Sequence, residues 1–519
     1  MRKLLRQHPE GFNDLLILML KIYSYKLKTI IVLIANLLAI NTFGQTLKQD
    51  SLHLLRDNRI LNTFVLSTNP ATLSQKIYPQ YGYVNVGANS LIGNFRRPME
   101  ANSTFQINVE TGGFKVLKGW AYNVFFNYHK QFDHDLAWSG IANAYEGNPF
   151  VWADSSVGNW ERDHIKTSIN VATPIVFKKL RAGLTLNYEV GSGARLSEPK
   201  PFYRQRYLTL QPGVTWTLSQ KKTIGIGGKI NFLQEENELG FFGNSNVLLY
   251  RLRGFGTFSK APFVSGERKR KGADLQTNVH YHHYHNDYEL FISAFAAHRE
   301  EEVIEGVAIQ QPTGYFTEIK YGGNTVLQKG NTQNGKSVTI AYQLKNGYAD
   351  DVIFRAESAS YSEHILNVNL SVWNTKLLKK TLLHFTLSPA LRTTDYTDHA
   401  TLTKFMATNL GSSLKVNWRK QLLPNVNLQL QPQLGYFHVI SNSFINQRPN
   451  VITQSLILPD YNFFASSFTQ FGGFAVLEVN QPMAGILHTF SFLNVNRFVV
   501  NNPFFSNRNN VQINYSIIF

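Results

Sequence analysis

The chain has 519 residues, of which only 16% are charged while 43% are hydrophobic and 13% are aromatic. A soluble protein averages about 25% charged residues, whereas here small polar residues fill many of those positions, so that the mean hydropathy is still -0.20. This composition suits a wall with one face in lipid and the other in water. Cysteine is absent, which excludes disulfides, a catalytic thiol and a cysteine-bound metal.

The first 44 residues have the pattern of a secretory signal peptide. Lysines precede an apolar run at residues 29–40, and small residues follow it, so residues 1–44 are predicted to be removed, leaving Gln45 as the first mature residue. A start at Met19 would make residues 1–18 a spurious extension. The alternative, a membrane anchor, needs about 20 apolar residues, and no run after the leader reaches that length either, which excludes a polytopic helical protein.

Residues 45–79 differ from the rest of the chain. Residues 51–61 suit a short helical turn, and Ser67 to Ala71, which include an Asn-Pro-Ala triplet, read as a turn. We predict that this segment lies in the periplasm or folds into the lumen of the domain that follows.

From residue 80 onward the dominant hydrophobic period is two, as in β-strands. Clear examples are residues 120–128, 165–173, 180–190 and 426–436, each about ten residues long, with Asn and Gln on the polar face. In the last of these, Leu430 is expected to face lipid and Gln429 the lumen. We therefore predict an all-β domain at residues 80–519, a transmembrane antiparallel up-and-down β-barrel of about 18 strands, within a range of about 14 to 20. A secreted β-sandwich would have shorter strands.

The end of the chain carries the sharpest strand pattern. Polar residues alternate with a row of apolar residues on one face, namely Val511, Ile513, Tyr515, Ile517 and Phe519. This row resembles the C-terminal signal by which the outer-membrane assembly machinery recognises barrels, and it predicts the closing strand.

The connections predict how the barrel is oriented. Residues 178–179, 219–221 and 286–287 suit tight periplasmic turns, whereas external loops are longer. This places residues 235–270 in one long external loop, and residues 299–335, which begin with three glutamates, form a second long excursion. The acids of the second loop are expected to pair with the basic run at 268–271 or to stay solvated.

Four histidines in six residues are the candidate metal ligands. His280 and His282 share one face of a strand, and His283 and His285 share the other. Either pair, completed by a nearby carboxylate, suits Zn²⁺, Cu²⁺ or Ni²⁺. The alternative is a belt of His and Tyr at the membrane interface, and apart from this cluster no cofactor is expected.

An enzyme is not expected. Acid and histidine neighbours occur at residues 133–135, 163–164 and 395–399, but the sequence has no GxSxG, no phosphate loop and no HExxH. The formal net charge of +17 is scattered, so nucleic acid is not an expected partner either. Anionic solutes or the phosphates of lipopolysaccharide suit this charge better.

The chain resembles the outer-membrane barrels of Bacteroidota in its leader, its aromatic-rich strands and its terminal Phe. More narrowly, the chain resembles an uncharacterised barrel family of that phylum seen beside TonB-dependent receptors and surface lipoproteins, with the Asn-Pro-Ala triplet at residues 69–71 and Arg-Gly-Phe-Gly at 253–256 as anchors. The triplet also resembles the plug of FadL-type transporters. The resemblance implies an integral outer-membrane location after cleavage near Gly44, with a receptor or lipoprotein as partner.

Three functions follow from these observations. The first is a pore or an accessory barrel in nutrient or metal uptake beside a TonB-dependent receptor. The second is a structural, secretion or assembly partner with a closed lumen, and the third is a FadL-like transporter of hydrophobic solutes.

Overall fold

The computed structural model describes residues 63–75, 80–240, 248–262, 266–306, 309–331, 334–378, 381–481 and 485–519. The chain divides into two units, Leu47–Ile518 and a second one made of Met1–Thr46 with Phe519. The predicted signal peptide and the helical turn at 51–61 lie outside the described residues. Among those that are described, no helix has both the length and the apolar character that crossing a membrane demands.

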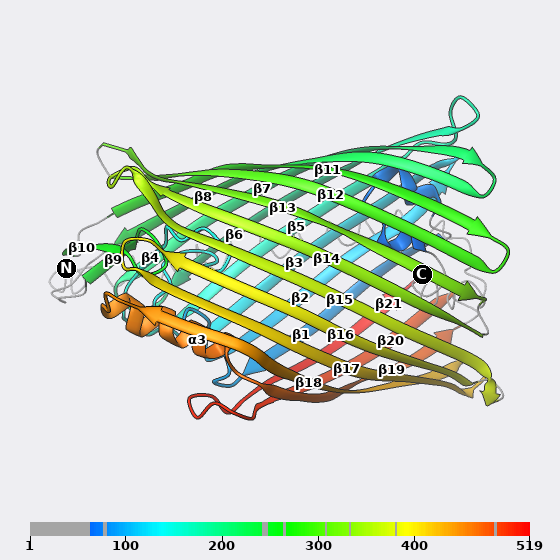
Figure 1. Ribbon diagram of the computed structural model, residues 1–519. Helices are drawn as coiled ribbons and strands as arrows, with labels where there is room; N and C mark the ends of the chain where they lie inside the picture. Colours follow the sequence, from blue (N-terminus) through cyan, green and yellow to red (C-terminus); the bar gives the residue numbers. More distant parts are fainter. Residues whose placement is uncertain are drawn as a thin grey trace, which may run out of the picture. The chain divides into compact units, whose positions relative to one another are not determined.

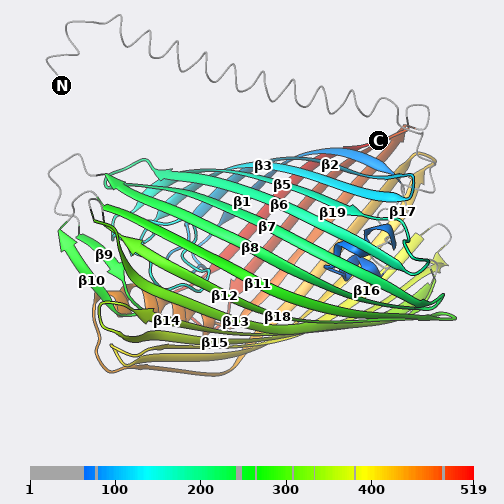
Figure 2. The same ribbon diagram turned by 90° about the horizontal axis from the view of Figure 1, so that it is seen from above.

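The larger unit is a closed barrel, and its described residues contribute 18 strands (Figure 1, Figure 2). Each strand pairs in antiparallel fashion with the next, and β21 pairs with β1 to close the barrel, Ile517 lying opposite Val84. The predicted fold class is therefore confirmed, including its strand number. The barrel strands are β1 (Tyr81–Ile92), β2 (Ser103–Leu117), β3 (Trp120–Leu136), β5 (Gly158–Ala172), β6 (Leu180–Arg195), β7 (Lys200–Ser219), β8 (Lys222–Gly240), β11 (Gly266–His285), β12 (Tyr288–Glu305), β13 (Gln311–Gly330), β14 (Asn334–Asp351), β15 (Ala356–Leu378), β16 (Thr381–Asp398), β17 (Thr403–Leu423), β18 (Val426–Asn446), β19 (Phe468–Gln481), β20 (Ile486–Val499) and β21 (Asn507–Ile518).

Side chains alternate between the outer face and the lumen along each strand. In β18, Leu430 and Leu434 are exposed on the outer face, whereas Gln429 is buried on the lumen side. The predicted assignment of faces in this strand is confirmed. In β21, Ile513 is 58% exposed on the outer face, while Asn514 faces the lumen, where its amide donates a hydrogen bond to Ser491.

The two ends of the barrel differ. At one end, the turn end, connections such as 118–119, 220–221 and 286–287 have two residues. Lys118 and Gly119 both have positive φ, at 49° and 82°, as a two-residue hairpin turn requires. The longest connections lie at the opposite end, the loop end.

Two predicted loops are instead strands. Glu235 lies in β8 and the basic run 268–271 lies in β11, so the long connection covers only residues 241–265. The prediction of a long external loop at residues 299–335 was wrong, because β12 continues to Glu305 and β13 begins at Gln311. The acids and bases therefore face one another across paired strands, Lys271 opposite Glu302, and alternation sends half of them into the lumen.

Smaller elements lie in the lumen and at the mouth of the loop end. At the loop end a three-stranded sheet and a helical segment gather together, and near the turn end two short 3-10 helices, coloured blue, lie within the barrel in both views (Figure 1, Figure 2). These elements are η1 (Thr63–Leu66), η2 (Pro70–Gln75), β4 (Trp152–Ala153), β9 (Leu248–Leu252), β10 (Phe258–Pro262), η3 (Thr453–Ile457) and α3 (Leu458–Phe464).

Candidate functional site

The lumen is filled at the loop end by three connections, residues 137–157, 248–262 and 447–467, which we call the loop plug. β4 of the first connection pairs with β9 of the second, and Trp152, Leu252 and Ile457 from the three connections share one apolar core. The same core includes Leu239 of β8 and Phe405 of β17. Seven steps around the sheet separate these two strands, so the plug spans the lumen.

The Arg253–Gly256 motif forms the tip of the hairpin between β9 and β10. Arg253 donates a hydrogen bond from Nη2 to Glu305 at 3.0 Å and one from Nη1 to the carbonyl of Thr313 at 3.2 Å. Asp351 lies 3.8 Å from its Nε. Arg253 is buried with both carboxylates, so their mutual neutralisation offsets the cost of burial.

The next residues of the tip are held by β15 and β16. The ring of Phe255 meets Tyr396 edge-on at 4.7 Å between centroids. The carboxylate of Asp398 accepts hydrogen bonds from the backbone N–H of Gly256 and Thr257 at 2.8 and 2.9 Å and from the Thr257 hydroxyl at 2.7 Å. A side chain at Gly254 would collide with this carboxylate. The motif is thus the docking element of the hairpin, and Asp398 is a residue whose role the sequence did not reveal.

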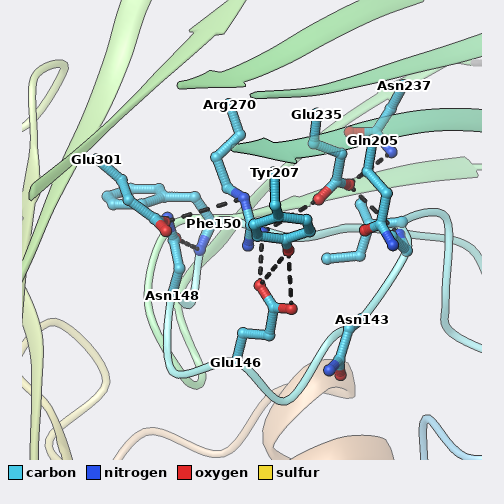
Figure 3. A network of polar contacts seen from close by, with 12 residues as sticks. Asn143, Glu146, Asn148, Phe150, Gln205, Tyr207, Glu235, Asn237, Arg270 and Glu301 are labelled. Atoms are coloured by element: carbon cyan, nitrogen blue, oxygen red, sulfur yellow. Dashed lines mark hydrogen bonds and ion pairs between the residues drawn. The ribbon is translucent and has the colours of Figure 1, made fainter. Parts of the chain in front are cut away.

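A second polar network holds the 137–157 connection (Figure 3). Glu146 reaches from this connection to the wall, where Arg270 Nη2 lies 2.5 Å from its Oε2 and the Tyr207 hydroxyl donates to its Oε1 at 3.1 Å. Glu235 Oε2 is 3.3 Å from the same Arg270 nitrogen. Asn148 donates from Nδ2 to Glu301 at 2.6 Å.

The wall side of this network is buried in the lumen. Arg268 and Arg270 are 1% exposed, and Arg268 donates to the carbonyl of Phe150 at 2.5 Å and to Asn237 at 2.8 Å. The two arginines of the basic run therefore do not stay solvated, because strand alternation turns them inward against the plug, while Lys269 and Lys271 point outward. Removing one partner of such a buried pair costs about 3–5 kcal/mol.

The third connection is attached through α3. Arg97 donates two parallel hydrogen bonds to Asp460, each 2.5 Å long, and its guanidinium lies 3.6 Å from the ring centre of Tyr145. Burial alone would lower the pKa of Arg97, but the Asp460 carboxylate raises it above its usual value. This bidentate pair joins the connection after β1 to α3 and to the 137–157 connection.

Residues 63–75, which we call the N-terminal segment, line part of the lumen near the turn end. Asn69 donates from Nδ2 to the carbonyls of Val214 and Ile226 at 3.1 and 2.9 Å, and its Oδ1 accepts from the N–H of Ala71. Side chains at Gly183 and Gly213 would collide with the Asn-Pro-Ala triplet. The triplet therefore fits a glycine-lined depression of the wall, while the described part of the predicted 45–79 segment lies against β6 and β7.

The histidine cluster splits between the two faces of β11. His280 and His282 are buried on the lumen side, whereas His283 and His285 lie on the outer face. His282 Nε2 is 2.8 Å from Glu289 Oε1, and the Thr63 hydroxyl donates to the same oxygen at 2.7 Å. The His282 ring also lies 4.1 Å from the ring of Phe64, between centroids, so His282 contacts the N-terminal segment. Within the described residues no group of three or more candidate ligands converges, and metal binding stays a prediction.

The acids and histidines that are adjacent in the sequence, at residues 133–135 and 395–399, contact other residues rather than each other. Asp133 binds Arg162 at 2.8 Å, Asp398 anchors the plug, and His399 Nε2 is 3.0 Å from Glu357. The acids at 133 and 163 lie in strands rather than in loops.

These features define a class of protein, a closed 18-strand β-barrel with an apolar outer face and a polar lumen that its own connections fill. A family model described as a family of unknown function (DUF6850) matches residues 70–519, and the chain belongs to that family. No curated protein sequence matches.

Solved structures of barrels are similar at low identity. The ferric preacinetobactin receptor BauA from Acinetobacter baumannii is 7% identical, with a TM-score of 0.38, covering 85% of this chain and 80% of its own. The ferric citrate transporter FecA is 8% identical, with a TM-score of 0.43 and coverage of 85% and 79%. The copper transporter OprC is 9% identical, with a TM-score of 0.40 and coverage of 84% and 81%.

Proposed function

We propose that this protein is an integral outer-membrane barrel for nutrient uptake that passes a polar solute when its loop plug is displaced. The exposed apolar side chains of its outer face, such as Leu430 and Ile513, suit the hydrocarbon layer. The loop end would face outward, because periplasmic turns are short and external loops long.

The observation that carries this proposal is the polar lining between the loop plug and the N-terminal segment. The inward residues there include Asn127, Asn187, Gln276, Asn324 and Asn367. A lumen built for hydrophobic solutes would bury apolar side chains instead, so the FadL-like alternative is disfavoured. A structural or assembly partner with a permanently closed lumen is the second candidate, and the buried contacts of the loop plug favour it.

A reversible lock separates these two functions. A Cβ built on Gly256 lies 2.9 Å from the Thr401 hydroxyl oxygen, within reach of a disulfide, and 2.6 Å from Thr453 Cγ2, so the Thr453 side chain must shift to admit it. The chain has no cysteine of its own. We expect Gly256→Cys/Thr401→Cys to show fewer openings in planar bilayers when oxidised and more after reduction, with each single cysteine variant as control. Conductance that never appears, in the wild type or in the reduced variant, would favour the closed partner.

The proposed location includes a cleaved leader and surface partners. Sequencing of the mature protein should begin at Gln45, and an intact Met1 or Met19 would contradict the leader. Lys269 and Lys271, which alternate with the buried arginines, point outward at the loop end and are proposed to meet lipopolysaccharide phosphates. A Bacteroidota-type TonB-dependent receptor or surface lipoprotein is the proposed protein partner, and co-purification from native membranes tests it.

A further inference from the structure

A cavity of about 290 Å³ lies in the lumen against β11 to β15. Ser67 and Thr68 of the N-terminal segment form one side, and β11 to β15 form the rest. None of the described residues that line it carries a charge. The inward polar side chains that strands contribute are Gln276, Asn278, His280, Ser293, Asn324, Gln343 and Asn367.

Two of these polar side chains have unused hydrogen-bonding atoms. Asn278 and His280 are each only 5% exposed, yet Asn278 Nδ2 and His280 Nε2 have no hydrogen-bond partner among the described protein groups. Buried polar atoms are almost always paired, and these two unpaired nitrogens lie covered against the glycines of β8. A solute in the cavity would therefore pair with them once the two side chains turn away from β8.

The neighbouring strand makes room for these side chains. Gly225 and Gly227 of β8 lie opposite His280 and Asn278. A Cβ at Gly225 would collide with the His280 ring, and one at Gly227 would crowd the Asn278 amide. Their positions therefore depend on glycine at both sites of the paired strand.

We propose that this cavity binds one neutral, polyhydroxylated solute of monosaccharide size. Asn and Gln amides each offer a donor and an acceptor, as neighbouring hydroxyls require, and the ring of Phe295, which also lines the cavity, suits the apolar face of a sugar. A charged solute finds no counter-charge, and an apolar one leaves the buried amides unpaired. The volume lies near the lower limit of about 300 Å³ for ligand pockets, which favours one ring over a chain.

This inference deepens the proposed function by naming its solute class, and a binding experiment tests it apart from conductance. Purified full-length mature barrel in detergent is titrated by calorimetry with glucose, galactose and N-acetylglucosamine, and with glucose 6-phosphate and decanoate as charged and apolar comparators. We expect saturable binding of at least one neutral sugar and none of the comparators. Binding of a comparator as tight as the best sugar, or no sugar binding, would overturn the proposal.

Variants locate the binding to this cavity. Asn278→Ala removes one unpaired donor and should weaken sugar binding by about tenfold, and Ala341→Trp, at a small lining residue, should abolish it by filling the space. Asn187→Ala is the matched control, because this amide faces the lumen from β6, outside the cavity lining. Equal affinity in a folded Asn278→Ala or Ala341→Trp barrel and the wild type would refute the assignment. Conductance that persists without sugar binding would refute only the solute class.

Discussion

Replacing Asp398 with alanine should unseat the loop plug without unfolding the barrel. The carboxylate accepts three hydrogen bonds from the plug hairpin and two more from Thr401, in the connection between β16 and β17. In Asp398→Ala the hairpin tip loses its three bonds, while the ladder between β16 and β17 remains, because it is made by the backbone.

The magnitude follows from those three bonds. A hydrogen bond contributes about 1 kcal/mol net, and more when the acceptor is charged, so the seated plug loses about 3 kcal/mol relative to the displaced one. This equals a shift of about two orders of magnitude in the opening equilibrium, since 1.4 kcal/mol is about tenfold. Released backbone N–H groups can bind water once the tip has moved, which favours displacement further.

Planar-bilayer recording gives the readout. We expect the open probability of Asp398→Ala to rise strongly above that of the wild type, with normal heat-modifiable barrel on gels. Asp395→Ala is the matched control, because Asp395 lies on the same strand but pairs with Lys404 at 3.3 Å on the exposed side, where a pair is worth about 0–1 kcal/mol. If Asp398→Ala folds normally and its conductance and loop proteolysis equal those of the wild type, the carboxylate does not seat the plug.

Three further predictions concern the wall and its histidines. Leu430→Arg should lower barrel stability by about 2–4 kcal/mol if Leu430 lies at the membrane midplane, and Gln431→Arg, on the lumen face, should lower it by much less. Urea unfolding in lipid measures both changes. The reverse order would show that the lipid and lumen faces of this strand are assigned the wrong way round. Phe519→Asp should reduce the yield of assembled barrel more than the conductance per barrel, and a normal yield would argue against the closing signal. If the inward histidines bind Zn²⁺ or Cu²⁺, His280→Ala/His282→Ala should abolish an uptake of about one equivalent that also weakens in acid, because the ligand must be neutral. If uptake is lost only when His283 and His285 are replaced, the metal binds on the outer face. If no uptake occurs at micromolar metal, the cluster is an interfacial belt.

The wall of the barrel was predictable from local pattern. Alternation over ten or more residues determines which face of a strand is apolar, and the spacing of such runs gave the strand number. Leu430 and Gln429 therefore occupy the predicted faces. The pattern could not show where a strand ends at the loop end, because polar side chains occupy both faces of the strands there, as at Glu300 to Glu302.

The candidate site depended on contacts far apart in the sequence. Asp398 and Gly256 are 142 residues apart, and Glu146 and Arg270 are 124 residues apart, so no local period relates them. The only local signals were the Arg253–Gly256 motif and the Asn-Pro-Ala triplet, where glycine and proline mark backbone that must approach a neighbour closely.

The sequence by itself determined an antiparallel barrel with an apolar outer face, because alternate side chains of a strand point to opposite faces of the wall. Only the tertiary structure decided that the long connections fold back into that lumen, and that Arg268 and Arg270 are buried against them. The physical reason is that a loop folds inward only when the wall offers partners for its buried charges and backbone groups. Closing 18 strands brings those partners together from separate parts of the chain.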